Sequence, residues 1–253
     1  MWRAVGTYVR GTSHVRFDLP CQDYCAYERV VIGASPSLVI AIADGAGSAR
    51  LSEVGARATV DYLLRVIPAD LSNILDADQQ RARRWLECAR ANLKDIALEQ
   101  QCELKDLGCT ILFAILGQFT SFFAQIGDGG WVAQRDGEYT VVTWPSDGEY
   151  VNETTFLTSP NWADSITCRT LSNVSAVAGF TDGLQRLALQ LDTQTVYAPF
   201  FDPLFSVLRT ADDESALISP LIEFLSSERF AERTDDDKTL VLAYRLDPLL
   251  LQC

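Results

Sequence analysis

Three apolar, strand-like runs in this chain end at an Asp-Gly pair. Residues 37–43 lead into Asp44-Gly45, residues 120–126 lead through Gly127 into Asp128-Gly129, and residues 175–180 lead through Thr181 into Asp182-Gly183. A fourth acidic cluster, residues 235–237, comes directly before the mostly apolar run 238–243. A rigid scaffold holds carboxylates at strand ends, and converging carboxylates repel one another unless cations lie among them. The pattern therefore predicts a site for a hard metal ion with oxygen ligands.

The elements that must position these carboxylates follow from hydrophobic periodicity and turn signals. We expect strands over residues 5–9, 23–31, 38–43, 110–116, 120–126, 130–135, 139–144 and 239–246. We expect helices over 53–67 (capped by Ser52 and ended by Pro68), 78–104 (capped by Asp78), 183–191 and 214–226. Hairpin signals such as Asp136-Gly137 and the grouping of helices favour an α+β fold with an antiparallel sheet. We expect one domain over residues 1–253, with a flap or loop at about 145–175.

Composition excludes several classes of partner. The formal net charge of -13 argues against binding to nucleic acid or to anionic membranes. Seven cysteines without a CxxC pair, and a single histidine, make a zinc site of the Cys/His type unlikely and favour reduced thiols in the cytoplasm. The N-terminus shows no signal-peptide pattern, and no apolar stretch is long enough to span a bilayer.

The chemistry-bearing segments have a fixed order along the chain. They are residues 21–23, 44–47, 108–110, 127–130, 179–183 and 236–239. An isolated Asp-Gly pair usually marks a surface turn, but six such segments in this order are hard to explain as turns. The series resembles the metal-dependent type 2C serine/threonine protein phosphatases, and Asp44-Gly45-Ala46-Gly47-Ser48 is most similar to their bacterial branch.

This resemblance implies a fold, a cofactor and a set of site residues. The fold would be a central antiparallel β-sandwich flanked by helices on both sides. Two Mg²⁺ or Mn²⁺ ions would lie at one edge of the sandwich, with a third, weaker site as in bacterial relatives. The implied metal residues are Asp44 (bridging), Gly45 (backbone carbonyl), Asp182 and Asp236 (second metal), Asp23 (near the cluster) and Asp128 (third metal). Gly127 and Thr239 fit the supporting motif positions, and Asp44, Asp182 and Asp236 are the residues expected to carry catalysis.

The implied reaction is the hydrolysis of phosphoserine or phosphothreonine in proteins. A hydroxide bridging the two ions would attack phosphorus in line, without a protein nucleophile. The expected partner is a phosphorylated protein that is a target of a Ser/Thr kinase, and we expect a monomer.

The sequence departs from the family pattern at three places. The Arg expected five residues before the acidic residue of the first motif is Asp18, so Arg16 and His14 are the candidates for contact with phosphate. Ala46 occupies the position after Asp44-Gly45 of the second motif, where the family often has a histidine. The first motif reads Gln22-Asp23 and so has one carboxylate fewer. His14 is also a candidate general acid, with a loop histidine of no catalytic role as the alternative.

These departures leave two other functions open. One is a catalytically silent relative that binds phosphoproteins as a regulatory module. The other is a phosphatase that uses the same site on a small molecule.

Overall fold

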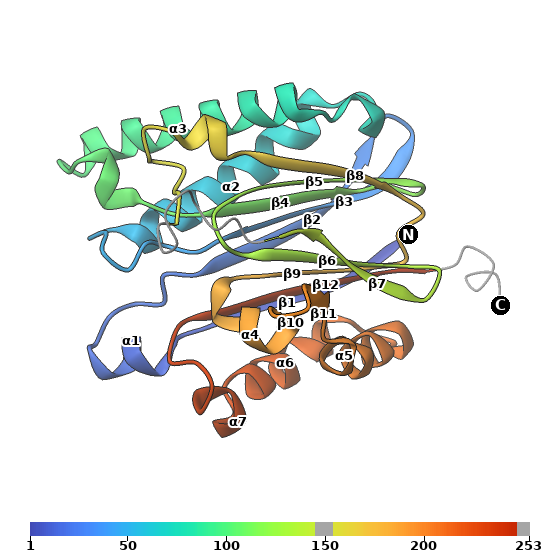
Figure 1. The fold of residues 1–253 in the computed structure, drawn as a ribbon. Coiled ribbons are helices and arrows are strands. Elements are labelled where there is room, and N and C mark those ends of the chain that lie inside the picture. Colours follow the sequence, from blue (N-terminus) through green and yellow to red (C-terminus); the bar gives the residue numbers. More distant parts are fainter. Residues whose placement is uncertain (145–153, 247–253) are drawn as a thin grey trace.

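Two five-stranded antiparallel sheets lie face to face in the computed structural model, which describes residues 1–144 and 154–246 (Figure 1). In spatial order, the first sheet contains β1 (Trp2–Val9), β12 (Lys238–Arg245), β9 (Ala176–Phe180), β6 (Gly130–Arg135) and β7 (Glu138–Thr143). The second contains β2 (Tyr24–Ile32), β3 (Ser35–Ala43), β4 (Ile111–Leu116), β5 (Thr120–Ile126) and β8 (Thr167–Ser172). A separate small hairpin joins β10 (Leu189–Gln190) to β11 (Thr195–Val196).

The two sheets enclose a dry apolar layer. Ile40 of β3, Phe123 of β5, Trp131 of β6, Val177 of β9 and Val241 of β12 are all fully buried in it. Because successive side chains of a strand point to opposite faces, the other faces of the same strands need a second cover. Helices supply that cover on both outer faces.

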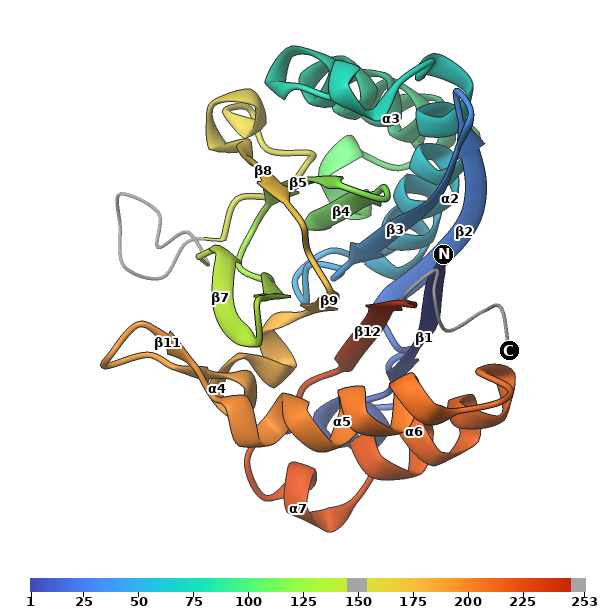
Figure 2. The same cartoon turned by 90° about the vertical axis from the view of Figure 1, so that its right-hand side faces the viewer.

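Helices cover the outer faces of both sheets (Figure 2). Against the second sheet lie α2 (Ser52–Asp70) and α3 (Gln79–Glu99), with the 3₁₀ turns η1 (Ile74–Asp76), η2 (Leu104–Leu107) and η3 (Trp162–Ser165) nearby. On the side of the first sheet are α4 (Gln185–Ala188), α5 (Ala198–Thr210), α6 (Ile218–Leu225) and α7 (Glu228–Ala231), with η4 (Asp182–Leu184) and η5 (Ser215–Leu217). The short α1 (Thr12–Arg16) follows β1. The expected α+β fold, a helix-flanked antiparallel β-sandwich, is confirmed.

Three expected helix boundaries are wrong. Pro68 does not end α2, which continues to Asp70, because a proline near the end of a helix removes only one hydrogen bond. Ser52 is the first buried residue of α2 and does not cap it; the cap position is Leu51. By contrast, Asp78 caps α3 as expected by accepting a hydrogen bond from the Arg81 N–H at 2.7 Å. That helix ends at Glu99, five residues before the expected 104.

The region expected to be a flap contains regular structure. Residues 154–175 include η3 and the strand β8, which pairs with β5 as the edge of the second sheet. Residues 145–153 of the expected flap lie outside the described part of the chain. The expected helix over 183–191 is replaced by η4, α4 and β10, and α5 is a helix that periodicity did not predict.

Within residues 1–144 and 154–246, no helix combines the length and apolarity needed to cross a membrane.

Candidate metal centre

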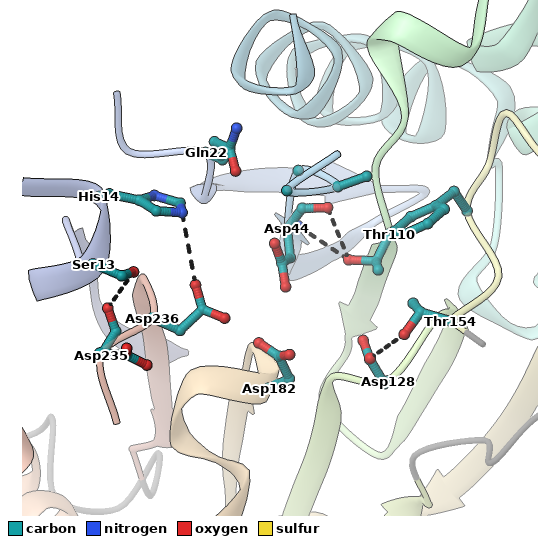
Figure 3. Close-up of a pocket in the computed structure, with 14 residues that line it drawn as sticks. Ser13, His14, Gln22, Asp44, Thr110, Asp128, Thr154, Asp182, Asp235 and Asp236 are labelled. Carbon is teal, nitrogen blue, oxygen red and sulfur yellow. Dashed lines mark hydrogen bonds and ion pairs between the residues drawn. The ribbon is translucent and has the colours of Figure 1, made fainter. Parts of the chain in front are cut away.

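Three aspartate side chains converge at one edge of the sandwich. One carboxylate oxygen from each of Asp44, Asp128 and Asp182 lies within 4.8 Å of the other two. Asp44 follows β3 and Asp128 follows β5 in the second sheet, whereas Asp182 follows β9 in the first sheet. Figure 3 shows the three side chains pointing toward one another. The site is therefore built between the two sheets.

Thr110, directly before β4, fixes the backbone of Asp44. The Asp44 N–H donates to Thr110 Oγ1 at 3.0 Å, and the Thr110 N–H donates to the Asp44 carbonyl oxygen at 2.8 Å. The next residue, Gly45, donates its N–H to the Gln22 carbonyl oxygen at 3.1 Å. These bonds leave the Asp44 carboxylate free to face the cavity.

Gly127 makes the turn that presents Asp128. Its φ of +107° is one that residues with a side chain rarely adopt, and a Cβ there would lie 2.5 Å from Thr110 Cγ2. The Gln125 side chain closes the turn by donating to the carbonyl oxygens of Gly127 and Gly129 at 3.2 and 3.3 Å. The turn at Gly127 therefore sets the backbone direction that brings Asp128 to the cavity.

Asp236 approaches the cluster from the loop before β12. It lines the same cavity as the three clustered aspartates, and its side chain is 52% exposed. The loop is held against the Asp182 turn by close backbone packing, since a Cβ on Gly183 would lie only 2.0 Å from the Asp237 carbonyl oxygen. Two segments far apart in the sequence therefore meet at this point.

Asp23 lies behind the cavity. It is 3% exposed and does not line the cavity wall. Its Oδ2 accepts hydrogen bonds from Thr181 Oγ1 and Thr239 Oγ1, both at 2.7 Å, while its buried Oδ1 has no hydrogen-bond partner among the described residues. Thr239, expected as a motif residue, is thus a direct partner of Asp23.

Burial and mutual repulsion shift the pKa values of these carboxyls upward. Burial raises the pKa of Asp44 well above its ordinary value, and the Asp23, Asp182 and Asp128 carboxylates raise it further. Burial, Asp128 and Asp236 raise the pKa of Asp182 to about 6. Burial also raises the pKa of Asp23, although the hydrogen bonds from Thr239 and Thr181 oppose that rise.

This donor set fits a divalent cation. Clustered carboxylates that resist ionisation are stabilised when a cation lies among them, and the unpartnered Asp23 Oδ1 is a buried oxygen that lacks a counter-charge or donor. Mg²⁺ and Mn²⁺ both prefer such oxygen ligands. The residues therefore suit either ion and do not distinguish between them.

His14 faces Asp236 across the cavity. Its Nε2 lies 4.0 Å from Asp236 Oδ1 (Figure 3). Its Nδ1 lies 2.9 Å from the buried Asp237 Oδ2. Asp237 also accepts hydrogen bonds from the N–H groups of Gly11 and Gln22, both at 2.6 Å. Asp237 thereby ties α1, the first motif and His14 together.

Arg16, the other candidate for phosphate contact, is exposed and does not line the cavity. Among the described residues, His14 is the only basic side chain in the wall of this cavity, which has a volume of about 330 Å³. A phosphate group entering it would therefore meet carboxylates, His14 and the hydroxyls of Ser13, Thr110 and Thr154.

Two contributions were not anticipated from the sequence. Thr154 donates a hydrogen bond to the Asp128 carboxylate, and Asp237 positions His14 and Gly11. A signal for Asp237 did exist, because side chains at the start of a strand alternate between faces and neighbouring Asp236 and Asp237 could not both reach the cavity. Thr154 carried no such signal.

Comparison with known proteins agrees with this geometry. The family model described as protein phosphatase 2C matches residues 10–226. Serine/threonine-protein phosphatase 3 of Escherichia coli (strain K12) is 36% identical over 253 residues, covering 96% of this chain and 98% of that protein.

Solved structures show the same fold at lower identity. A crystal structure of a bacterial serine phosphatase is 15% identical, with a TM-score of 0.70 over 96% of this chain and 98% of that one. The serine/threonine phosphatase Stp1 from Staphylococcus aureus is 14% identical, with a TM-score of 0.63 over 98% of this chain and 96% of that one. With the family model and the E. coli relative both spanning most of its length, the chain belongs to the protein phosphatase 2C family.

Proposed function

We propose that this metal-dependent protein phosphatase hydrolyses phosphoserine and phosphothreonine with Mg²⁺ or Mn²⁺ held between its two sheets. Asp44, Asp182 and Asp236 would hold two ions, with the Gly45 carbonyl as a further ligand. Asp128 would serve a third, weaker site, and Asp23 would supply a charge just behind the ions. The convergence of the Asp44, Asp128 and Asp182 carboxylates within 4.8 Å carries this proposal.

Bound at these carboxylates, the cations supply an activated water for attack on phosphorus and offset the negative charge of the phosphate. The chain itself contributes the rigid placement of the carboxylates at strand ends, which is the arrangement that positioning and electrostatic stabilisation require.

His14 is assigned to the departing serine or threonine oxygen. That oxygen leaves as an alkoxide unless it receives a proton, and a positioned histidine is the usual donor. The His14 Nδ1 lies 2.9 Å from the Asp237 carboxylate, while its Nε2 lies 4.0 Å from Asp236 in the wall of the cavity. Arg16 lies outside the cavity wall, which leaves His14 as the remaining candidate for contact with phosphate.

The test is metal-dependent hydrolysis of phosphothreonine and phosphoserine peptides by the purified protein. We expect turnover with Mn²⁺ or Mg²⁺ and none in excess chelator. We expect a loss of at least about 10³-fold in kcat/KM for Asp44→Asn, since Asp44 would be a principal ligand of the catalytic ions. Asp192→Asn, a change at an exposed surface residue, is the matched control and should retain activity. Calorimetric binding of two ions without turnover on any phosphopeptide or phosphometabolite would favour the silent regulatory relative. Turnover confined to phosphometabolites would favour the small-molecule phosphatase.

The proposed cellular setting is the cytoplasm, where a Ser/Thr kinase would generate the substrate and the phosphatase would act as a monomer. Size-exclusion chromatography with light scattering tests the monomer, and a dimer stable at micromolar concentration would contradict it.

A further inference from the structure

A second cavity, separate from the carboxylate cluster, lies in the helical layer over the first sheet. It has a volume of about 370 Å³ and is lined by residues of α4, α5, α6 and α7, whose places are seen in Figure 1. This volume is at the lower end of the range for ligand-binding pockets. None of its lining residues belongs to the metal centre.

The floor of this cavity is aromatic. Phe200, Phe224 and Phe230 form a cluster in which the ring centroids of Phe224 and Phe230 are 4.8 Å apart, and each is 6.3 Å from that of Phe200. Phe200 and Phe230 are buried, and Tyr197 at the edge is 41% exposed. Such a floor favours a bulky apolar side chain over a fully polar ligand.

The rim carries only positive charge. Arg186, Arg229 and Arg233 are the only charged residues that line the cavity, in a chain with 34 acidic and 21 basic residues. All three are exposed, and within residues 1–144 and 154–246 none of their guanidinium groups makes an ion pair or a side-chain hydrogen bond. Three unpaired arginines around an apolar floor are complementary to an anion that also has an apolar body.

The position of the rim links it to the metal centre. Arg186 lies on α4, which directly follows the Asp182 turn, and Arg233 is separated from the acidic run 235–237 only by Thr234. Those two segments pack together through Gly183 and Asp237. A chain held at this rim would therefore lie beside the segments that carry Asp182 and Asp236.

We infer that this cavity docks an acidic segment of a partner protein, with one bulky apolar side chain on the aromatic floor and flanking carboxylates on the three arginines. A peptide fits better than a small metabolite, because the charged groups stand on the rim while most of the remaining lining is apolar. Under the proposed function, on which the identity of this partner rests, the partner is the phosphoprotein substrate. The docking site would then supply the positive charge that the catalytic cavity lacks.

The test is a direct binding measurement by fluorescence anisotropy. The probe is a fluorescein-labelled peptide, Glu-Asp-Phe-Asp-Glu, without phosphate, at low ionic strength and with chelator present. We expect saturable binding of this probe by the wild type. The affinity should fall by at least about tenfold for the triple variant Arg186→Glu/Arg229→Glu/Arg233→Glu. It should fall by a similar factor when the wild type meets a probe with alanine in place of phenylalanine. The control variant Arg83→Glu/Arg84→Glu/Lys94→Glu, on the exposed face of α3, changes the net charge by the same amount and should bind as the wild type does.

A thermal unfolding midpoint like that of the wild type confirms that the docking variant is folded. If the Glu variant is not folded, Arg186→Gln/Arg229→Gln/Arg233→Gln replaces it, and the same loss of affinity is expected. No saturable binding by the wild type, or equal binding by the docking and control variants, overturns the inference. Because neither metal nor phosphate is present, this outcome is independent of whether the protein hydrolyses phosphopeptides.

Discussion

Replacing Asp182 by asparagine should stabilise the metal-free protein while removing its activity. Asp182 is partly buried beside Asp44 and Asp128, and these surroundings raise its pKa from 3.8 to about 6. A raised pKa means that the folded state holds the proton more tightly than the unfolded state does. The carboxyl therefore favours folding below pH 3.8, and that advantage is lost as the pH rises through about 6.

The size of the effect follows from the shift. The rise in the pKa of Asp182 from 3.8 in the unfolded chain to about 6 in the folded protein corresponds to an unfavourable contribution of about 3 kcal/mol to folding at pH 8. By the same linkage relation it falls to about 1 kcal/mol at pH 4.5. An asparagine carries no charge at either pH, so we expect Asp182→Asn to raise the free energy of unfolding by about 1–3 kcal/mol at pH 8 and by less at pH 4.5.

The assay is urea unfolding in excess chelator at both pH values, followed by tryptophan fluorescence. Asp192→Asn, at an exposed position, is the control and should change stability by less than about 0.5 kcal/mol. Saturating Mn²⁺ should make the wild type the more stable of the two proteins. An ion at about 100 times its Kd adds about 2.7 kcal/mol to the free energy of unfolding of the wild type, and less to that of a variant lacking a ligand. A metal-free variant that is less stable than the wild type at pH 8, or a gain that is equal at both pH values, would refute the repulsion argument.

Three further changes test the supporting structure. Gly183→Ala should destabilise the protein by about 1–3 kcal/mol in urea unfolding, because the new Cβ would lie 2.0 Å from the Asp237 carbonyl oxygen. The control Gly47→Ala should be nearly neutral, because no atom lies within 4 Å of the Cβ it would add. Thr239→Val should cost about 1–3 kcal/mol, because it removes a hydrogen-bond donor from the buried Asp23 carboxyl group. Restoration of stability by Thr239→Ser would confirm that the hydroxyl is responsible. His14→Gln should lower kcat for a phosphoserine peptide by about 10²-fold but have little effect on p-nitrophenyl phosphate, whose leaving group needs no proton; equal losses on both substrates would argue against the general-acid role.

The strands that carry the carboxylates could be predicted because each is a continuous apolar run, without alternation of polar and apolar residues, that ends at turn residues. The runs before Asp44, Asp128 and Asp182 are core strands whose side chains are buried on both faces, so each reads as a continuous apolar stretch. All four acidic ends were expected to converge, with Asp128 at the periphery; in the structure the Asp44, Asp128 and Asp182 carboxylates form the tight group, and Asp236 lines the same cavity. The sequence could not show that the site lies between two sheets, since pairing is a long-range property.

The helical layer beside the first sheet was predicted less well. Helix α5 contains Pro203 in its interior, which disfavours a helix in local terms, yet its buried Phe200, Phe201, Phe205 and Leu208 hold it on the sheet. Packing of an apolar face outweighs propensity in such a case. The edge strand β8 was missed for a related reason, because its exposed and half-buried residues lack the apolar run of a core strand.

The pairing of the first strand with the last has a consequence for biosynthesis. β12 lies between β1 and β9, and Asp236 stands at its start. Until the ribosome has released this segment, β1 and β9 have no strand between them, and one expected metal ligand does not yet exist. The Asp236 segment of the proposed metal centre and the strand that joins β1 to β9 therefore enter the fold together.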